Sequence, residues 1–352
     1  MLSFKKDNIS SFLMKPKIGI SIGDINGIGP EIVIKTFLNK KLFEICTPIV
    51  YGHTSIISYY LDILNIQNID FQIIENPECA VEGQVNIIHC WDNEAQIDIG
   101  QATNIAGEYA LKAITLCTQD TLAQKIDAMI TAPIHKKNIS NQIPFSGHTE
   151  YITQQVNVKE SLMFMISKQL RVGLVSNHIA LKDVVGKITE NIILEKLQII
   201  NHSLQKDFDI EKPRIAVLGL NPHNGEEGIM GKEEQTIIRP AIEKAWKKHK
   251  ISALGPFSAD GFFGAKKYLE FDATLAMYHD QGLIPFKTLS FGKGVNFTAG
   301  LPIIRTSPDH GTGFDIAGKN IANERSFKAA LIAAIEIKKS REKHLQIKHN
   351  NF

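Results

Sequence analysis

Strand-like and helix-like segments alternate along almost the whole chain, and this alternation is the feature that most restricts its fold. Apolar runs of strand length lie at residues 17–22, 128–131, 162–166, 172–175, 215–220 and 273–277. Stretches with helical periodicity lie at residues 31–38, 107–125, 188–206 and 231–249. Because this alternation is typical of a mainly parallel sheet covered by helices, the sequence predicts an α/β protein.

The length of the chain indicates more than one domain. With 352 residues it exceeds the size at which a single hydrophobic core usually stops growing, so we expect two α/β domains. Neither a low-complexity linker nor an internal repeat marks a boundary between them. The two domains therefore need not be continuous segments of the chain.

Charge, hydropathy and cysteine spacing argue against several classes of protein. A formal net charge of +2 is too small for a surface built to bind nucleic acid. No segment approaches the roughly 20 apolar residues that cross a bilayer, and residues 1–17 lack a signal-peptide pattern. We therefore expect a cytoplasmic protein without nucleic-acid or membrane partners. Its dispersed cysteines are expected to stay reduced, and they are Cys46, Cys79, Cys90 and Cys117.

The C-terminal segment is rich in basic residues. Glu336 and Glu342 interleave with the cations, so the pattern favours a solvated helix face over a nucleic-acid-binding tail. The cations are Lys338, Lys339, Arg341, Lys343 and Lys348.

Residues 276–287 contain several side chains that can bind a metal ion or carry a charge. The cluster follows a predicted buried strand, so His279 and Asp280 are expected where that strand ends and a loop begins. Ligands of α/β proteins bind at that edge of the sheet. Lys287 adds an ammonium group to the same segment.

Three histidines occupy comparable places, each just after a predicted strand: His178, His223 and His279. Convergence of the strand ends would bring them together. Neutral imidazoles bind zinc and other divalent transition metals, and three of them leave positions open for a substrate. A lone histidine is more often a loop or core residue, so it is the repeated placement that predicts a metal site.

A second polar cluster, residues 146–150, allows two interpretations. It either begins a helix, with Thr149 or Ser146 as the cap, or places His148 and Thr149 on substrate oxygens, because helix starts attract anions. The sequence does not decide between the two.

Lys287, Asn296 and Arg305 form a spaced set of hydrogen-bond donors among apolar and glycine positions. Arg305 follows four apolar or proline residues, where a cation without a partner is expensive to bury. A guanidinium is suited to bidentate capture of a carboxylate or phosphate. The set therefore predicts an anion-binding site.

Two glycine-rich loops invite comparison with nucleotide-binding loops. Residues 23–30 depart from the glycine spacing of the dinucleotide fingerprint and lack the lysine of a P-loop. A tight turn is as good an interpretation of them as an anion site. Residues 309–318 either wrap a nucleotide or form a structural turn.

Taken together, these segments resemble the 4-hydroxythreonine-4-phosphate dehydrogenase family of vitamin B6 biosynthesis, from about residue 17 to about residue 339. The motifs that carry the resemblance are residues 23–31, 131–136, 147–150, 219–223, 276–282 and 305–312. Several are specific on their own, and their order along the chain matches as well. Departures from the usual pattern at Ile25, Asn26, His135 and Ser146 replace no expected ligand.

The resemblance implies a fold similar to that of isocitrate and isopropylmalate dehydrogenases, with two α/β domains and a cleft between them. We expect residues 1–140 together with 306–352 to form one domain and residues 141–305 to form the other. The resemblance also implies a homodimer whose active sites lie at the subunit interface, with metal ligands drawn from both chains.

The resemblance assigns roles to the candidate residues. The ligands of a divalent metal would be His178, His223 and His279. The substrate-binding set would be His148, Thr149, Lys287, Asn296 and Arg305. The cofactor NAD, with NADP as the alternative, would bind the loop of residues 310–323 through His310, Gly311, Thr312, Asp315 and Asn320. The unranked candidates for proton transfer are Lys136, His148 and Asp280.

The implied reaction is the oxidation and decarboxylation of 4-phosphooxy-L-threonine to 3-amino-2-oxopropyl phosphate, in pyridoxal phosphate biosynthesis. Zinc, cobalt, magnesium or manganese on the substrate hydroxyl would lower its pKa, and the resulting β-keto acid would lose carbon dioxide. One alternative is a paralogous dehydrogenase of threonate or erythronate phosphate. The others are a phosphate acyltransferase of related architecture and a metal-binding protein without catalysis.

Overall fold

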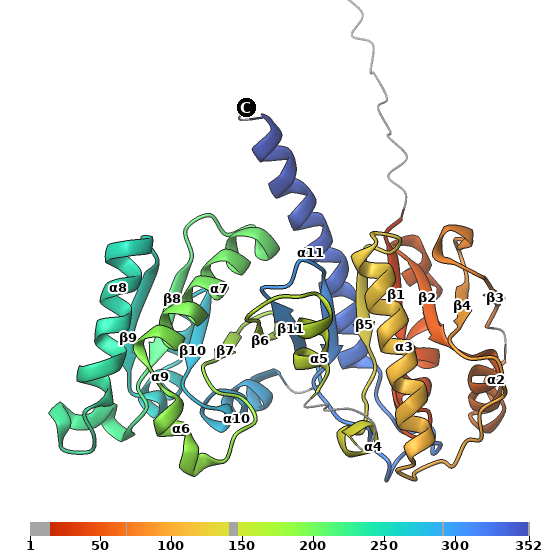
Figure 1. Ribbon diagram of the computed structural model, residues 1–352, viewed down its shortest axis with the longest axis horizontal. Helices are drawn as coiled ribbons and strands as arrows, with labels where there is room; N and C mark the ends of the chain where they lie inside the picture. The colour runs from red at the N-terminus through yellow and green to blue at the C-terminus, as the bar shows by residue number, and fades with distance from the viewer. Residues whose placement is uncertain (1–14, 68, 141–146, 291, 351–352) are drawn as a thin grey trace, which may run out of the picture.

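One 12-stranded sheet runs through the computed structural model, which describes residues 15–67, 69–140, 147–290 and 292–350 (Figure 1). The order of strands across the sheet is β3-β4-β2-β1-β5-β12-β11-β6-β7-β10-β8-β9. In chain order the strands are β1 (Lys17–Ser21), β2 (Thr47–Gly52), β3 (Phe71–Ile73), β4 (Val85–His89), β5 (Ala128–Thr131), β6 (Leu162–Ile166), β7 (Arg171–Leu174), β8 (Arg214–Leu218), β9 (Ser252–Phe257), β10 (Ala273–Ala276), β11 (Val295–Ala299) and β12 (Arg305–Pro308).

Helices connect these strands and cover the sheet (Figure 1). The α-helices are α1 (Gly29–Phe37), α2 (Thr54–Ile63), α3 (Asn104–Leu122), α4 (Lys136–Ser140), α5 (His148–Gln155), α6 (Leu181–Lys187), α7 (Glu190–Phe208), α8 (Arg239–His249), α9 (Ala259–Gly264), α10 (His279–Ser290) and α11 (Arg325–Asn350). Shorter helical turns are η1 (Lys40–Glu44), η2 (Pro77–Cys79), η3 (Pro222–Gly228), η4 (Glu234–Ile238) and η5 (Lys267–Glu270). The predicted strands and helices all occur, within about three residues of the expected bounds. The predicted α/β class is confirmed.

Most neighbouring strands are parallel, as the sequence predicts. The exceptions lie in the middle of the sheet, where β11 runs antiparallel to both β12 and β6, and β6 runs antiparallel to β7. No strand is predicted from the sequence at β11 or β12, and for β6 and β7 periodicity reports burial and not strand direction.

The continuous apolar runs are strands buried along their whole length. Every residue of β2, β5, β6, β10 and β12 is buried, which removes the apolar and polar alternation of a half-exposed strand. In β1, Gly19 permits close packing, because a Cβ atom there would lie 2.4 Å from Cδ1 of Ile126. Strand β12 differs from the apolar runs, since its buried residues Arg305, Thr306 and Ser307 are polar.

The sheet consists of two halves that meet at one junction. Strands from residues 17–131 together with β12 form the first half, and strands from residues 162–299 form the second. The halves join where β12 pairs with β11, with Ser307 opposite Asn296. The expected division into residues 1–140 with 306–352 and residues 141–305 stays a prediction, since the sheet is continuous across this junction.

Helix α11 packs across the junction, against β12, β11, β5 and α7 (Figure 1). The expectation of a solvated basic face is wrong for Arg341, which is 8% exposed and donates from Nε to Oδ1 of Asp207 at 2.6 Å. Helical spacing explains this, because Ala334, Ile337 and Arg341 lie on one buried face. Lys338 is also paired, with Nζ 2.7 Å from Oδ1 of Asp127.

Two further expectations concern the chain as a whole. All four cysteines are free thiols, as predicted. Over the part of the chain that the structure describes, no helix is both long enough and apolar enough to cross a membrane.

Replacement of Arg341 by Met should lower the free energy of unfolding by about 3 kcal/mol, because it leaves the carboxylate of Asp207 buried without its cation. Urea unfolding followed by circular dichroism measures this loss. The matched control is Lys247→Met, which breaks an exposed pair with Glu243 and should cost less than about 1 kcal/mol. Equal effects of the two substitutions would show that the Arg341 pair does not hold α11.

Candidate functional site

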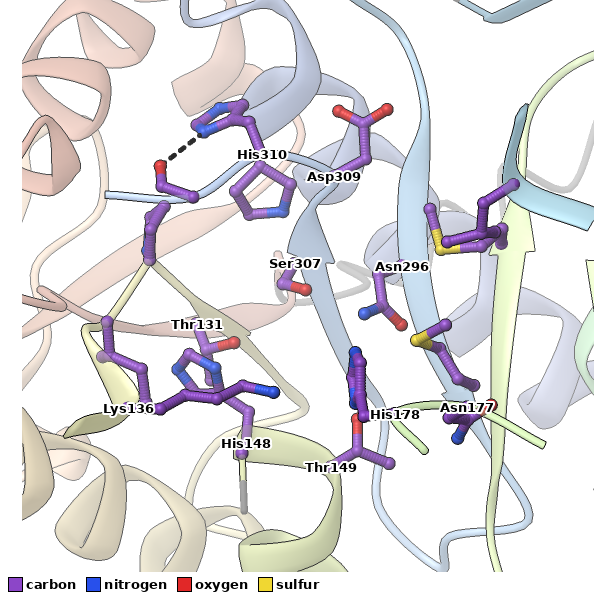
Figure 2. A pocket seen from close by; sticks show the side chains of 18 of the residues that line it. Thr131, Lys136, His148, Thr149, Asn177, His178, Asn296, Ser307, Asp309 and His310 are labelled. Carbon is purple, nitrogen blue, oxygen red and sulfur yellow. Dashed lines mark hydrogen bonds between the residues drawn. The ribbon is translucent and has the colours of Figure 1, made fainter. Parts of the chain in front are cut away.

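A cavity of about 250 Å³ lies at the junction between the two halves of the sheet (Figure 2). Its polar lining comes from both halves and consists of Thr131, Lys136, His148, Thr149, Glu150, Asn177, His178, His279, Lys287, Asn296, Arg305, Ser307, Asp309 and His310. The structure thus brings the whole predicted substrate-binding set to one place, together with two of the three predicted metal ligands. Residues more than 100 positions apart in the sequence meet there because the strand ends converge.

Arg305 is the most buried cation of the cavity, with 1% of its surface exposed. Its Nε donates to Oγ1 of Thr131 at 3.1 Å and its Nη1 donates to Oγ1 of Thr298 at 3.1 Å, while Nη2 also donates to Thr131. Among the described residues these hydroxyls are its hydrogen-bond partners, and no carboxylate forms an ion pair with it. Burial lowers the pKa of Arg305 to about 9, so the guanidinium stays charged at neutral pH. A buried, charged fork of this kind is built to receive an anion.

The other polar groups reinforce this preference for an anion. Lys136 and Lys287 add two ammonium groups to the lining, against the two carboxylates of Glu150 and Asp309. Figure 2 shows the Lys136 side chain directed toward His178. Oδ1 of Asn296 is buried and has no hydrogen-bond partner within the described residues, which leaves it for a ligand donor. The site therefore suits an anion that also carries polar groups.

His148 is the first residue of α5, so the interpretation of this cluster as a helix start is confirmed. The residue at the N-cap is Gly147, with φ of 155°, and not Thr149; Ser146, the other expected cap, lies outside the described residues. Burial, Arg305 and Lys136 together hold the pKa of His148 well below its usual range. A neutral imidazole beside an anion site is able to accept a proton.

His178 and His279 lie close together in the cavity, with ring centroids 5.7 Å apart. Burial, with Lys136 nearby, lowers the pKa of His178, so its ring is neutral at pH 7. Nδ1 of His279 lies 2.7 Å from Oδ1 of Asp280, which leaves Nε2 for another partner. Asp280 thus orients His279. The donor set fits a transition metal, because it provides two imidazoles, at least one of them neutral.

His223 does not lie in this cavity. It belongs to the turn η3, where its φ is 53°, and it lines a neighbouring hollow together with Asp260 and Asp280. Within the described ranges of the single chain, no group of three or more His, Cys, Asp or Glu side chains is placed to hold a metal ion. The three-histidine metal site therefore stays a prediction that one chain alone does not complete.

The two glycine-rich loops pack against each other beside the cavity. The backbone N–H of Ile28 donates to the carbonyl of Thr312 at 2.8 Å, and a Cβ atom at Gly27 would lie 2.7 Å from that oxygen. Residues 310 and 311 line the cavity, whereas Asp315 and Asn320 are exposed on the same loop. The expected cofactor contacts of this loop stay predictions.

Sequence reasoning missed several polar residues of the site. Thr131 ends a predicted strand and Asn177 precedes His178. Their positions at strand ends could therefore have identified them as candidate site residues. Nothing in the sequence could have identified Thr298, because it is a fully buried residue inside β11 and its role depends on the approach of Arg305. Glu150, Ser307 and Asp309 lie inside motifs that were singled out for other residues.

Comparison with known proteins gives consistent results. The family profile described as pyridoxal phosphate biosynthetic protein PdxA matches residues 44–334. A 4-hydroxythreonine-4-phosphate dehydrogenase from Bacteroides thetaiotaomicron is 44% identical over 331 residues, which cover 94% of this chain and 90% of that protein. A protein from Oceanobacillus iheyensis, named provisionally as a D-threonate 4-phosphate dehydrogenase, is 38% identical over 92% of this chain and 98% of its own length.

A solved structure supports the same similarity. The crystal structure of 4-hydroxythreonine-4-phosphate dehydrogenase from Klebsiella pneumoniae has a TM-score of 0.83 and 32% sequence identity. The match covers 93% of this chain and 99% of that one, so the similarity extends over the whole sheet.

Replacement of Arg305 by Met should weaken the binding of inorganic phosphate at least about tenfold, because two or more charge-assisted hydrogen bonds are lost. Isothermal titration calorimetry measures the affinity. Arg305→Lys should keep part of it, since an ammonium retains the charge but not the bidentate fork. The matched control is Arg214→Met, which removes a guanidinium that stacks on Phe271 away from the cavity. Unchanged phosphate binding in Arg305→Met would contradict the anion site.

Proposed function

The chain belongs to the family of the pyridoxal phosphate biosynthetic protein PdxA, and from that premise we propose that it oxidises and decarboxylates 4-phosphooxy-L-threonine to 3-amino-2-oxopropyl phosphate. The relatives named in this family are dehydrogenases, so the chain is an oxidoreductase. The observation that supports a phosphorylated substrate is the buried guanidinium of Arg305, which has no carboxylate partner among the described residues and faces a cationic cavity.

The charges of the cavity match those of the proposed substrate. At neutral pH this substrate carries a phosphate, a carboxylate and an ammonium group. Arg305 and Lys287 supply the cations for the anionic groups, and Asn296 supplies an uncommitted carbonyl oxygen for the ammonium or hydroxyl group. Binding through both ends of the substrate would fix the carbon that loses hydride.

The proposed chemistry needs a base for the hydroxyl proton. Bound NAD would accept the hydride, and a bound divalent ion would supply Lewis acidity toward the substrate hydroxyl. His148 is our choice as the base, because its neutral ring lies beside Arg305 and Lys136 at the start of α5. Loss of carbon dioxide from the β-keto acid breaks the bond to the carboxyl carbon and leaves its electron pair as an enolate. Lys136 would stabilise that negative charge.

We propose that a second copy of the chain completes the metal site. His178 and His279 face one cavity while His223 faces the next, so a shared ion would need ligands from two chains. The surface around His223 supports this proposal, because large apolar side chains there are exposed. They are Ile229, which follows η3, at 81% exposed, and Ile284, which lines the same hollow as His223, at 63% exposed. A homodimer would cover this surface.

The proposed place of the cofactor is the loop of residues 310–323, through His310, Gly311, Thr312, Asp315 and Asn320. The support is that His310 and Gly311 line the cavity, and that the loop is held against residues 27 and 28 by backbone contact. NAD is the proposed cofactor, and NADP is the alternative.

A second candidate substrate is D-threonate 4-phosphate, because a relative with 38% identity carries the name of that dehydrogenase. The two substrates differ at one carbon, where threonate carries a hydroxyl group in place of the ammonium. Both would use the same anion-binding donors.

A direct assay of both substrates with NAD tests the proposal. The kcat/KM for 4-phosphooxy-L-threonine should exceed that for D-threonate 4-phosphate by at least about tenfold, because a site that pairs with the ammonium discriminates against its absence. NAD reduction followed by absorbance measures both rates. Turnover of the threonate alone would select the second candidate, and turnover of neither would overturn the proposed function.

The pH dependence of the reaction tests the role of His148. Because its pKa lies below the usual value of about 6.5, His148 should stay neutral on acidification through pH 6.5, and kcat/KM should fall only at lower pH. Lys136→Met should shift this acid limb to higher pH, since it removes one of the causes of the lowered pKa. His148→Gln should lower kcat about 100-fold or more, whereas the exposed control His249→Gln should not change it. An acid limb at the same pH in Lys136→Met and the unaltered protein would contradict this assignment.

A further inference from the structure

One glutamine side chain bridges two of the histidine-bearing strand ends. Oε1 of Gln281 accepts from the backbone N–H of Met277 at 2.8 Å, and its Nε2 donates to the carbonyl of Gly219 at 2.6 Å. His279 follows Met277 by two residues, and His223 follows Gly219 by four. Gln281 therefore connects the segment of His279 to the segment of His223.

The bridge occurs where the backbone pairing of the strands stops. Strands β10 and β8 are parallel neighbours, and their last paired residues are Leu275 and Val217. Continued by two residues, the same register would place Met277 opposite Gly219. The side chain of Gln281 thus replaces the next rung of the ladder, and it extends the connection beyond the sheet edge toward the histidines.

Both neighbouring segments are themselves held by hydrogen bonds. On one side, Oγ of Ser176 donates to the carbonyl of Met277 at 2.9 Å, two residues before His178. On the other, Oε1 of Glu234 accepts from the backbone N–H groups of Leu220 and Asn221 at 2.8 and 2.7 Å. Glu234 is 1% exposed, so its carboxylate is shielded from water. Gln281 lies at the centre of a hydrogen-bonded chain that joins all three strand ends.

We propose that Gln281 is a positioning residue, which fixes the separation between His279 and the His223 turn and thereby preorganises each chain's contribution to metal binding. This inference rests on the proposed function, because it takes the three histidines as metal ligands. The residue type is required by the geometry, since the bridge needs an acceptor and a donor on one side chain. Glutamate would lose the donor, and methionine would lose both groups at a similar length.

The test is the affinity of the metal-free protein for Co²⁺, measured by isothermal titration calorimetry and by the visible spectrum of the bound ion. Gln281→Met should raise the Kd for Co²⁺ about tenfold or more and alter the spectrum. Gln205→Met is the matched control, because Gln205 also accepts one hydrogen bond, from Asn201, and donates one, to the carbonyl of Glu211, away from the site. The control should bind Co²⁺ as the unaltered protein does.

The outcomes separate this inference from the function on which it rests. Absence of Co²⁺ binding in the unaltered protein, or binding that survives His279→Ala, would overturn the metal site itself. Binding that is lost in His279→Ala but unchanged in Gln281→Met, in affinity and spectrum, would overturn only the positioning role. Circular dichroism and thermal unfolding of the metal-free variants establish that they are folded. If Gln281→Met does not fold, Gln281→Glu, which keeps the acceptor for Met277, undergoes the same measurements with the same expected loss.

Discussion

The charge of Arg305 is the constraint on which the site depends. Its guanidinium lies inside the sheet, at the start of β12, and its hydrogen-bond partners within the described residues are the hydroxyls of Thr131 and Thr298. A buried cation without a counterion is unfavourable. A bound anion would supply the missing negative charge and would thereby stabilise the folded protein. The junction between β5, β11 and β12 is therefore both the centre of the fold and the centre of the anion site.

Burial lowers the pKa of the neighbouring imidazoles, and the same positive field lowers it further. Arg305 and Lys136 add to the effect of burial at His148, and Lys136 does so at His178, so both rings have lowered pKa values. Neutral rings serve two purposes in the proposed reaction. His148 would accept a proton, and His178 would bind a metal, which an imidazolium cannot do. In the proposed reaction, burial and this cluster of cations would together prepare the cavity for the substrate, the proton and the metal ion.

The sequence predicted six of the twelve described strands, β1, β5, β6, β7, β8 and β10, because their burial is locally encoded, whereas β2, β3, β4, β9, β11 and β12 were not predicted. Fully buried strands such as β6 and β10 appear as apolar runs, and α3 and α7 appear as periodic segments, whatever their neighbours are. Strand direction in the centre of the sheet was not encoded in this way, since β6 has the composition of any buried strand, and β11 was not predicted as a strand at all. The burial of Arg341 was missed for a similar reason, because its partner Asp207 belongs to a different helix.

For the candidate site, the sequence by itself determined which residue types stand at the ends of which strands. That pattern selected His279, while a predicted helix start selected His148 and cationic or amide donors among apolar positions selected Lys287, Asn296 and Arg305. The family resemblance supported these choices, and all five residues line one cavity. Only the tertiary structure decided how these side chains meet. His178 and His279 share the cavity, whereas the left-handed backbone of His223 turns it into the next hollow. The physical reason is that the end of a strand is a local pattern in the sequence. The direction of a side chain beyond that end depends on the turn that follows and on contacts between segments distant in sequence. The hydrogen bonds of Gln281 are such contacts.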